Sequence, residues 1–273
     1  MQVVVITGLA DGMGREVAKT LADGGAAVAG FDVDAEKIAS LRAELAGDPL
    51  LATLDIADRP AVFRFRDEVL AKYGHVDVVL SNVGIGFFGP FEEVDLDKAS
   101  HCMEINVLGT AAVFQAFLPS MRERRAGKLI AMSSLVGQIP FPFESIYTAS
   151  KFAVEGLVLA LRYEAAPFGI KVAIVQPAQV STSFAAKIHH LPPEGSPYRE
   201  RVRRFIARDN EMIRSAPTPA GAAADIVRLV RSDDPPLFTR VDFKSRFFLA
   251  INKFMPQAWK DEILVRTMDI KVS

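Results

Sequence analysis

The segment QVVVITGLADGMGREVAKTLADGG, residues 2–25, decides the fold of this chain. Its run VVVIT is rich in β-branched side chains, which is typical of a buried parallel strand. A glycine-rich turn follows at once, and a helical pattern comes after it. This order suits a phosphate site, because glycines let the backbone approach a pyrophosphate and a helix N-terminus offers unpaired N–H groups. The residues predicted to bind there are Gly8, Asp11, Gly12, Met13 and Gly14.

The glycine turn alone also fits an ordinary strand-to-helix connection, and the next strand favours a dinucleotide site over this alternative. The run AAVAGF ends in Asp32, about twenty residues after the glycine turn, where a carboxylate accepts hydrogen bonds from a ribose diol. A carboxylate there also repels a 2′-phosphate. Asp11 adds a second negative charge, and Val33 supplies no cation. We therefore expect the cofactor to be NAD rather than NADP.

The alternation of strands and helices continues along the chain. Helical patterns at 34–45 and 59–73 alternate with the strand patterns LLATLD and VDVVLS. Repeated units of this kind predict a parallel, doubly wound α/β sheet. Ligands of such sheets bind beyond the carboxyl ends of the strands. The residues at that edge, expected on the adenosine side of the site, are Asp55, Ile56, Asn82 and Gly84. The alternative role of Asp55 is that of a helix N-cap.

The segment SSLVGQIPFPFESIYTASK, residues 133–151, holds side chains suited to proton transfer. Tyr147 and Lys151 are four residues apart in a helical pattern, so they lie on one helical face. An ammonium at Lys151 favours the phenolate and lowers the pKa of Tyr147 toward the range of a general acid or base. Ser134 ends a strand pattern and can stabilise charge on a substrate oxygen. Tyrosine and lysine at this spacing also occur by chance on surface helices.

The composition excludes several classes of protein. The 32 Lys and Arg residues nearly balance the 33 Asp and Glu residues, so no charge excess indicates nucleic acid or an anionic membrane. The single cysteine, Cys102, excludes an internal disulfide framework, and four scattered histidines offer no metal-ligand spacing. No uninterrupted apolar run reaches membrane-spanning length, and no signal-peptide pattern precedes the first strand. We expect a cytoplasmic, soluble protein without a metal site.

Asn106 is a polar amide in the apolar context MEINVLGTAAVF, within a helix expected from about Leu96 to Arg122. A buried amide needs hydrogen-bond partners. These partners can belong to a functional site, or they can be neighbouring core groups that satisfy the amide. The residues alone leave both interpretations open.

Taken in order, these motifs resemble those of the short-chain dehydrogenase/reductase family. TGLADGMG is similar to the family's TGxxxGxG fingerprint, and the later matches, from Val3 to about residue 240, are Asp32, LDIAD, SNVG, Asn106, GKLIAMSS, YTASK and QPAQVST. The resemblance implies a three-layer Rossmann fold with a doubly wound, mostly parallel seven-stranded sheet and helices on both faces. It also implies a single domain over residues 1–240.

The resemblance further implies a catalytic tetrad of Asn106, Ser134, Tyr147 and Lys151. Tyr147 would pass the proton, and Ser134 would orient and polarise the carbonyl or hydroxyl group. Ser134 is favoured over Ser133 because it precedes Tyr147 by thirteen positions. Lys151 would hold the nicotinamide ribose, so that both it and Tyr147 would contact the cofactor, and Asn106 would anchor a water of the proton relay. The residues that match the segment gripping the nicotinamide carboxamide are Pro177, Val180 and Thr182.

The chain departs from the family pattern in three places. The family's NNAG is SNVG at 81–84, and its PG is Pro177-Ala178. Both changes are small and leave backbone contacts possible. Many members close with a strand and a glycine pair, whereas PPLFTRVD leads here into a tail predicted as a helical extension over residues 241–273. The family's homodimer or homotetramer, formed through the helices that carry Asn106 and Tyr147, is therefore carried over only as an analogy.

The substrate loop of the family corresponds to residues 183–216. Side chains in stretches that flank the expected site predict an apolar pocket for a hydrophobic alcohol or ketone of steroid, retinoid or long-chain type. These side chains are Phe87, Phe88, Ile139, Phe141, Phe143 and Phe184. The segment GQIPFPFESIYTASKFAVEG also resembles steroid and retinol dehydrogenases. Core packing is the alternative explanation for most of the 19 phenylalanines.

Two amphipathic segments follow the expected site. One face of RERVRRFIAR carries Val202, Phe205 and Ile206, and the arginines around them suit either a lid that attracts an anionic substrate or a solvated surface. In the tail, the apolar residues at helical spacing are Phe243, Phe247, Ile251 and Phe254. This tail face is expected to pack over the pocket, to pair with a second subunit, or to rest on a membrane surface, in that order.

The leading hypothesis is an NAD-dependent alcohol dehydrogenase or ketone reductase. The nearest alternative is an NADPH-dependent carbonyl reductase, which the charges of Asp11 and Asp32 disfavour. A non-catalytic dinucleotide-binding regulator is a third alternative, because a fold does not by itself imply a function. Such a regulator has little reason to keep the four residues of the tetrad together.

Overall fold

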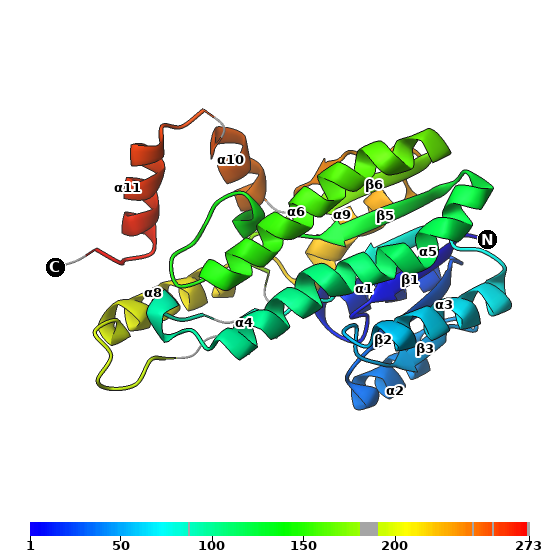
Figure 1. Cartoon of the computed structure of the whole chain (residues 1–273), viewed down its shortest axis with the longest axis horizontal. Helices are drawn as coiled ribbons and strands as arrows, with labels where there is room; N and C mark the ends of the chain where they lie inside the picture. Colours follow the sequence, from blue (N-terminus) through cyan, green and yellow to red (C-terminus); the bar gives the residue numbers. More distant parts are fainter. Residues whose placement is uncertain (87, 181–190, 242, 253, 272–273) are drawn as a thin grey trace.

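A parallel sheet of seven strands lies at the centre of the protein (Figure 1). The computed structural model describes residues 1–86, 88–180, 191–241, 243–252 and 254–271, without the side chains of 243 and 244. The strand order is β3-β2-β1-β4-β5-β6-β7, and all six pairings are parallel. The predicted doubly wound sheet is confirmed. The strands are β1 (Val3–Thr7), β2 (Ala27–Asp32), β3 (Leu50–Thr53), β4 (Val78–Ser81), β5 (Gly127–Met132), β6 (Ile170–Val175) and β7 (Phe238–Thr239).

Strand β1 shows why the central strands are almost wholly apolar. All of its residues are buried, and successive side chains point to opposite faces of the sheet. Val4 and Ile6 join the core on one face, while Val3 and Val5 join the core on the other. A strand that is covered on both faces leaves little room for polar side chains. The unbroken run VVVIT therefore predicted this layer correctly.

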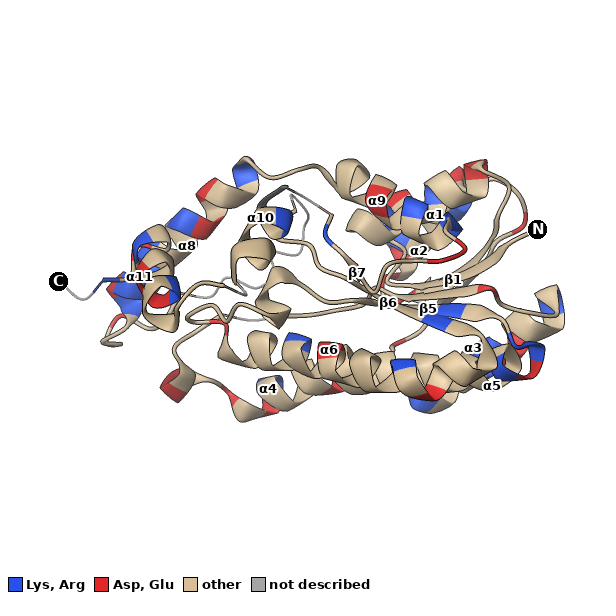
Figure 2. Cartoon of the chain, turned by 90° about the horizontal axis from the view of Figure 1, so that it is seen from above, with Lys and Arg blue, Asp and Glu red and all other residues tan. Residues whose placement is uncertain are grey.

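Helices cover both faces of the sheet (Figure 2). One face is covered by α1 (Gly12–Asp23), α2 (Ala35–Glu44) and α9 (Pro219–Arg231). The other face is covered by α3 (Arg59–Tyr73), α5 (Thr110–Arg124) and α6 (Ser145–Ala165). Among the described residues, single-turn 3₁₀ segments also occur at Phe91–Glu93, Leu135–Gly137 and Ala166–Phe168.

The helix expected over residues 96–122 extends to Arg124 and contains one wide turn. Its first part, α4 (Leu96–Met103), continues through the π-helical turn Glu104–Gly109 into α5. By length and composition, Leu96–Arg124 is apolar enough to cross a membrane, but 56% of its most apolar window is buried inside the fold. It packs against α3, α6 and β4. Its apolar composition therefore fits a core helix of this fold.

Three further helices lie beyond the carboxyl ends of the strands, at the left of Figure 1: α8 (Arg199–Arg214), α10 (Phe243–Asn252) and α11 (Gln257–Thr267). The apolar face predicted for α8 is confirmed, because Val202 and Phe205 are fully buried. Its arginines hold the end of the chain through backbone oxygens: Arg201 donates to Ile270 at 3.2 Å, Arg204 to Asp269 at 3.0 Å and Arg208 to Thr267 at 3.0 Å. These three arginines bind the tail, while Arg203 and Arg208 remain 61% and 43% exposed, as expected for a solvated amphipathic helix.

The tail does not bury the face that its helical spacing predicted. In α10, Ser245 and Leu249 are fully buried, whereas Phe247 is 50% exposed. Phe254, which follows the helix, is 88% exposed. The side chain of Phe243 lies outside the described residues. The spacing predicted the helix correctly and its covered face wrongly, because the neighbouring elements decide which face is covered.

The end of the tail packs near the expected substrate side. Met268 and Ile270 are buried in a small core with Phe88 and Phe205. Of the roles expected for the tail, these contacts support packing beside the pocket.

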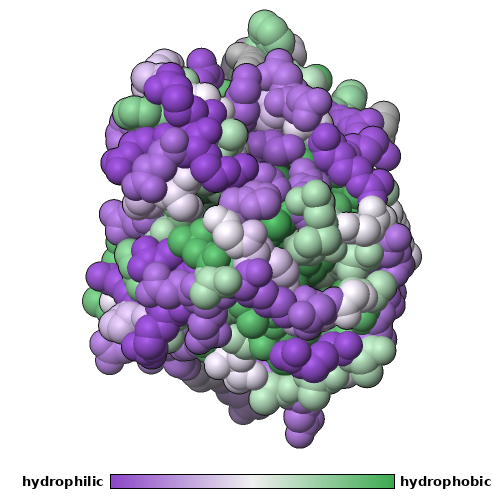
Figure 3. Space-filling model, turned by 90° about the vertical axis from the view of Figure 1, so that its right-hand side faces the viewer, coloured by the Kyte–Doolittle hydropathy of each residue, from purple (hydrophilic) through white to green (hydrophobic). Residues whose placement is uncertain are grey.

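The opposite end of the molecule, which carries the amino terminus, presents mainly hydrophilic residues with small separate apolar patches (Figure 3).

Candidate active site

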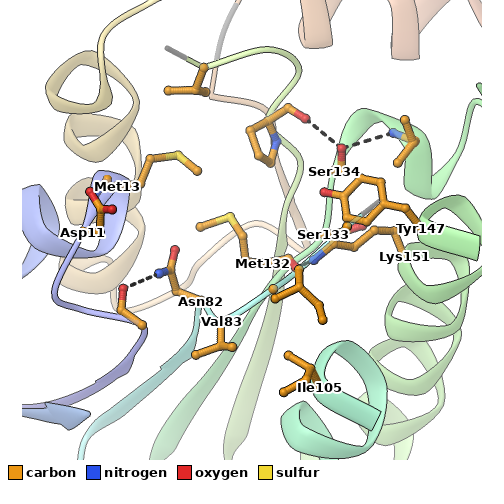
Figure 4. A pocket seen from close by; sticks show the side chains of 18 of the residues that line it. Asp11, Met13, Asn82, Val83, Ile105, Met132, Ser133, Ser134, Tyr147 and Lys151 are labelled. Carbon is orange, nitrogen blue, oxygen red and sulfur yellow. Dashed lines mark hydrogen bonds between the residues drawn. The ribbon is translucent and has the colours of Figure 1, made fainter. Parts of the chain in front are cut away.

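A cavity of about 610 Å³ opens beyond the carboxyl ends of the central strands. This is where a doubly wound sheet binds its ligand. Figure 4 shows Asp11 and Met13 on one side of the cavity and Ser134 and Tyr147 on the other. The predicted residues that share its lining are Gly8, Asp11, Gly12, Met13, Asp32, Asp55, Ile56, Asn82, Gly84, Ser134, Tyr147, Lys151, Pro177 and Val180.

The glycine turn has a shape that glycine adopts without strain. Gly8 and Gly12 have φ angles of +64° and +54°, in the left-handed region. Gly14 is not in the cavity lining, but a Cβ there would lie 2.3 Å from the carbonyl oxygen of Gly8, so no side chain fits. Asn82 donates from Nδ2 to the backbone oxygens of Gly8 at 3.0 Å and Thr7 at 3.2 Å. Asn82 therefore fixes the turn to β4 as well as lining the cavity.

Asp32 ends β2 beside the glycine turn. One of its carboxylate oxygens accepts a hydrogen bond from the backbone N of Ala10 at 3.2 Å, and the other accepts from the backbone N of Asp34 at 3.2 Å. These bonds hold an anionic group at the cavity wall, in the position expected for a ribose ligand.

Lys37 is a cation near Asp32 that the sequence analysis missed. Its Nζ lies 2.5 Å from Oδ2 of Asp11 and 3.7 Å from Oδ2 of Asp34, and Lys37 itself lines the cavity. The hydrogen bond with Asp11 is the main cause that raises the pKa of Lys37. We expected no cation in this region because Val33, which follows Asp32, is uncharged. Lys37 lies in the first turn of α2, where the fold and not the sequence spacing brings it to Asp11.

Asp55 lines the cavity and does not cap a helix. The N-cap of α3 is Asp58, while Asp55 accepts a hydrogen bond from the backbone N of Ala57 at 2.9 Å. The alternative role of Asp55 as a cap is therefore wrong. Ile56 is 2% exposed, and its side chain fills the space beside Gly109 of the π-helical turn.

Tyr147 lies near the start of α6 and points toward Ser134 (Figure 4). Burial and then the negative charge of Glu144 raise the pKa of Tyr147, while a hydrogen bond with Ser134 lowers it, and the net shift is upward. The expected lowering by Lys151 is wrong for the protein alone, because the loss of water around the buried phenol outweighs other effects. Tyr147 is therefore a neutral phenol at neutral pH, ready to donate its proton.

Lys151 is buried one turn after Tyr147. Its Nζ donates to the backbone oxygen of Met132 at 2.9 Å and lies 5.6 Å from the centre of the Tyr147 ring. Burial lowers the pKa of Lys151 to about 8. A Cβ at Gly84 would lie 3.1 Å from this Nζ. Glycine at position 84 therefore leaves room for the ammonium group.

Asn106 lies in the π-helical turn, a feature that is frequent at functional sites. Its Oδ1 accepts from the backbone N of Ile85 at 2.8 Å, and its Nδ2 donates to the backbone oxygen of Ile85 and to Oγ of Ser150, both at 2.8 Å. Asn106 is 1% exposed and is not in the cavity lining. Its amide is satisfied by neighbouring groups, as in the core interpretation, and joins the β4 loop to α6.

Glu155 supports the serine loop and was missed by the sequence analysis. This α6 residue is 5% exposed. Its Oε1 accepts from Oγ of Ser133 and Nε2 of Gln176, both at 2.8 Å, and its Oε2 accepts from Nε2 of Gln138 at 3.1 Å. Burial raises the pKa of Glu155, and these hydrogen bonds partly offset the rise. The available signal was an acid in the apolar helical run that follows Lys151.

The segment after β6 is bound to the Ser134 loop. The backbone oxygen of Pro177 accepts from the backbone N of Leu135 at 2.7 Å and from Oγ of Ser134 at 3.5 Å. The backbone N of Val136 donates to Oγ of Ser134 at 3.4 Å. Val180 is 8% exposed and lines the cavity. The predicted site residues that lie outside the described residues are Phe87, Thr182 and Phe184.

Aromatic side chains border the end of the cavity near Tyr147. Phe88 and Phe141 line it, whereas Ile139 and Phe143 are not among the described lining residues. Phe88 and Phe143 each pack edge-on against Phe205, with ring centres 5.8 Å and 5.6 Å apart. Phe143 therefore supports the apolar wall from behind.

Two buried carboxyls at this end were also missed. Glu144 precedes α6 and Asp209 lies on α8, and each is 5% exposed and lines the cavity. Burial and then the negative charge of Asp209 raise the pKa of Glu144 well above its usual range. The available signal for Asp209 was its place on the apolar face of its helix, four residues after Phe205.

The family model for short chain dehydrogenases matches residues 2–191 of this chain. The matched part includes the glycine turn, Asp32, Ser134, Tyr147 and Lys151. The chain belongs to the short-chain dehydrogenase/reductase family. Known members resemble this short-chain dehydrogenase/reductase over most of its length. The mouse dehydrogenase/reductase SDR family member 7B is 36% identical over 203 residues, which are 72% of this chain and 62% of the mouse protein.

Two further similar proteins are matched over more of their own length. The 3-ketodihydrosphingosine reductase of Bacteroides thetaiotaomicron is 31% identical over 243 residues, which are 88% of this short-chain dehydrogenase/reductase and 87% of that protein. A solved short-chain dehydrogenase from Streptomyces avermitilis has a TM-score of 0.83 at 30% identity and covers 100% of this chain and 98% of its own. The chain spans less than two thirds of the mouse relative.

A nicotinamide dinucleotide, the cofactor typical of this family, fits the residues of this short-chain dehydrogenase/reductase. Gly8, Gly12 and Gly14 add no side chain to the turn, so a pyrophosphate can approach its backbone and the N-terminus of α1. Asp32 offers oxygen acceptors to a ribose diol. At the other end of the cavity, Lys151 and the segment that begins at Pro177 would hold the nicotinamide half. The chain therefore carries a site for NAD or NADP.

Proposed function

We propose that this protein is an oxidoreductase that interconverts a secondary alcohol and a ketone, with NAD as its preferred cofactor and a hydrophobic compound as its substrate. One observation carries the proposal. The buried pair of Ser134 and Tyr147, with Lys151 beside it, shares one cavity with the glycine turn and Asp32. A carbonyl group in that cavity reaches a proton donor and the cofactor site together, and such positioning supplies much of a reaction's rate.

Each side chain has a role in the direction of ketone reduction. Tyr147 donates its phenolic proton to the carbonyl oxygen, and Ser134 hydrogen-bonds the same oxygen and stabilises the charge that develops on it. The raised pKa keeps the proton on Tyr147 until the developing alkoxide, a stronger base, takes it. The ammonium of Lys151 stabilises the tyrosinate that remains. The bound dinucleotide supplies the hydride, or accepts it in the reverse direction.

The charges near Asp32 support NAD. A 2′-phosphate would meet the carboxylate of Asp32, and the nearest described cation, Lys37, already lies 2.5 Å from Asp11 and 3.7 Å from Asp34. A phosphate would therefore compete with two carboxylates for one ammonium. Lys37 is also the observation that favours the second candidate, an NADPH-dependent carbonyl reductase, because this cation lines the same part of the cavity.

The walls near Tyr147 support a hydrophobic substrate. Phe88 and Phe141 line the cavity, and the small core of Phe143, Phe205 and Met268 stands behind them. A relative that aligns over most of its length is named for a ketone of a sphingoid, 3-ketodihydrosphingosine. Apolar walls with few polar groups are typical of pockets for such ligands. Compounds of steroid, retinoid or long-chain type are the substrates to test.

Cofactor and substrate preference are tested together by initial rates. We expect secondary alcohols with bulky apolar groups to yield NADH, with kcat/KM for NAD at least about tenfold above that for NADP. Replacement Asp32→Ser should move this ratio toward NADP by about tenfold, since it removes the repelling charge. A preference for NADP in the unaltered protein would contradict the cofactor proposal, and turnover confined to short polar alcohols would contradict the substrate proposal.

The outer face of the long helices supports a homodimer or homotetramer. Large apolar side chains on α6 and on the π-helical turn are exposed there, with Phe152 and Leu108 each 45% exposed. Such side chains favour association with a second copy. Light scattering coupled to size-exclusion chromatography would measure the mass in solution, and a monomer at micromolar concentration would overturn this part of the proposal.

A further inference from the structure

Glu144 occupies the N-cap position of α6 but does not cap the helix. An N-cap side chain normally accepts hydrogen bonds from N–H groups of the first turn, and the carboxyl of Glu144 makes no such bond. It lines the cavity one helical turn before Tyr147. It is 5% exposed, and no residue in the described part of the chain donates a hydrogen bond to its carboxyl, although the backbone N of Thr148 donates to its backbone oxygen at 2.7 Å. A buried carboxyl in this state costs free energy that a ligand can offset by donating hydrogen bonds.

Asp209 brings a second carboxyl to the same end of the cavity. It comes from α8, is 5% exposed and belongs to the same lining. Nε2 of Gln179 donates to its Oδ1 at 3.4 Å. Its negative charge contributes to the raised pKa of Glu144. The two carboxyls therefore lie within electrostatic reach of each other on opposite elements of the cavity wall.

Three basic residues near the cavity are bound to other groups. Lys151 donates to the backbone oxygen of Met132. Arg201 lies over the ring of Phe143 at 5.7 Å and donates to the backbone oxygen of Ile270. Lys37 is bound to Asp11 at the other end of the cavity. The end near Tyr147 thus combines two acids with the apolar wall of Phe88 and Phe141.

We propose that the substrate carries a protonated amine close to its reacting carbon and an alkyl chain beyond it, and that Glu144 and Asp209 bind the ammonium group. The inference rests on the proposed oxidoreductase function and adds the class of substrate. A primary ammonium offers three hydrogen-bond donors and a positive charge to the two carboxyls, whereas a hydroxyl offers one donor and no charge. An anionic substrate would be repelled.

The amine is placed near the reacting carbon because of the helical geometry. Glu144 precedes Tyr147 by about one turn of α6, and its charge acts directly on the pKa of Tyr147. A group bound by Glu144 therefore lies beside the carbonyl that Tyr147 protonates. The aromatic wall then receives the chain on the far side of the carbonyl.

Matched ketones test the proposal by turnover. The pair is a long-chain α-amino ketone and the α-hydroxy ketone of the same chain, each assayed with NADH and NADPH. We expect kcat/KM for the amino ketone to exceed that for the hydroxy ketone by at least about tenfold. Glu144→Gln and Asp209→Asn, which keep size and remove charge, should each reduce this ratio at least about fivefold. Glu164→Gln, an exposed site on the same helix, should leave the ratio unchanged.

Calorimetry of dodecylamine and dodecanol binding gives a readout that needs no turnover. If the protein binds dodecylamine more tightly than dodecanol, and Glu144→Gln loses this preference, the ammonium site is supported. If neither ketone is reduced in the same protein, the proposed function fails while the ammonium site stands. Reduction of both ketones with no preference for the amine, or an equal loss for both in Glu144→Gln, would overturn the ammonium site and leave the proposed function in place. The second variant, Asp209→Asn, covers the case in which Glu144→Gln does not fold.

Discussion

Asn106 donates from Nδ2 to Oγ of Ser150 at 2.8 Å and thereby joins the π-helical turn to α6 between Tyr147 and Lys151. Ser150 donates in turn to the backbone oxygen of Tyr147 at 2.7 Å. The Asn106 amide also bonds the backbone N and O of Ile85, after β4, and donates to Sγ of Cys102 at 3.4 Å. One buried amide thus sets the position of the helix that carries both Tyr147 and Lys151.

Replacement Asn106→Ala should lower both stability and activity. It removes four hydrogen bonds and leaves the buried backbone N–H of Ile85 without its acceptor, so we expect the free energy of unfolding to fall by about 2–4 kcal/mol. Urea denaturation measures this loss. Ser150→Ala removes one partner only and should cost about 1 kcal/mol. An Asn106→Ala protein as stable and as active as the unaltered one would show that the amide does not position α6.

Gly14→Ala should abolish tight dinucleotide binding. A Cβ at Gly14 would lie 2.3 Å from the carbonyl oxygen of Gly8, so the turn must shift, at a cost of about 1–3 kcal/mol in stability. Fluorescence titration with NADH measures the affinity. The matched control is Gly156→Ala on α6, where a Cβ meets no atom within 4 Å; this change should stabilise the protein by about 0.5–1 kcal/mol. Unchanged NADH affinity in Gly14→Ala would refute the close-approach argument.

Glu155→Ala should weaken the support of the serine loop. The change leaves Ser133, Gln138 and Gln176 without their shared acceptor, and we expect a loss of about 2–3 kcal/mol in unfolding free energy together with a reduced kcat. Glu155→Gln keeps an acceptor oxygen and should restore part of both. Glu164→Ala, at an exposed position of α6, should change neither by more than about 0.5 kcal/mol. If kcat stayed constant while stability fell, Glu155 would be a core residue only.

The stability of the unaltered protein should rise relative to that of Lys151→Met as the pH increases above 8. Burial lowers the pKa of Lys151 from 10.5 to about 8, so between these values the unfolded chain binds the proton that the folded protein has released. The unfolded state then holds more protons, and the contribution of Lys151 to stability rises with pH. We expect a relative gain of about 1 kcal/mol or more between pH 8 and 10, measured by urea denaturation at each pH. A pH-independent difference would mean that Lys151 keeps its usual pKa.

Features that a few neighbouring residues determine were predictable from the sequence. The order of β1, the glycine turn and α1 depends on a buried strand followed by glycines. The shared face of Tyr147 and Lys151 depends only on their spacing along one helix. Asp32 ends β2 and Ser134 follows β5, and parallel strands bring their carboxyl ends to one edge.

Features that depend on distant contacts were not predictable. Glu144 and Asp209 come from separate elements, and neither residue's burial can be read from its neighbours in the chain. Lys37 reaches Asp11 only because α1 and α2 lie on the same face of the sheet. Phe247 is exposed for the same reason, because distant contacts decide which face of a helix is covered. Periodicity predicts the helix but not its covered face.

The most direct test of the proposed chemistry is the turnover of Tyr147→Phe, compared with its affinity for NADH. This change removes the phenolic proton and keeps the ring in place. We predict that kcat for a substrate of the unaltered protein falls by about 10²–10⁴-fold, the usual contribution of a general acid, while the dissociation constant of NADH stays within about threefold. Turnover that survives in Tyr147→Phe with NADH still bound would contradict the assignment of Tyr147 as the proton donor.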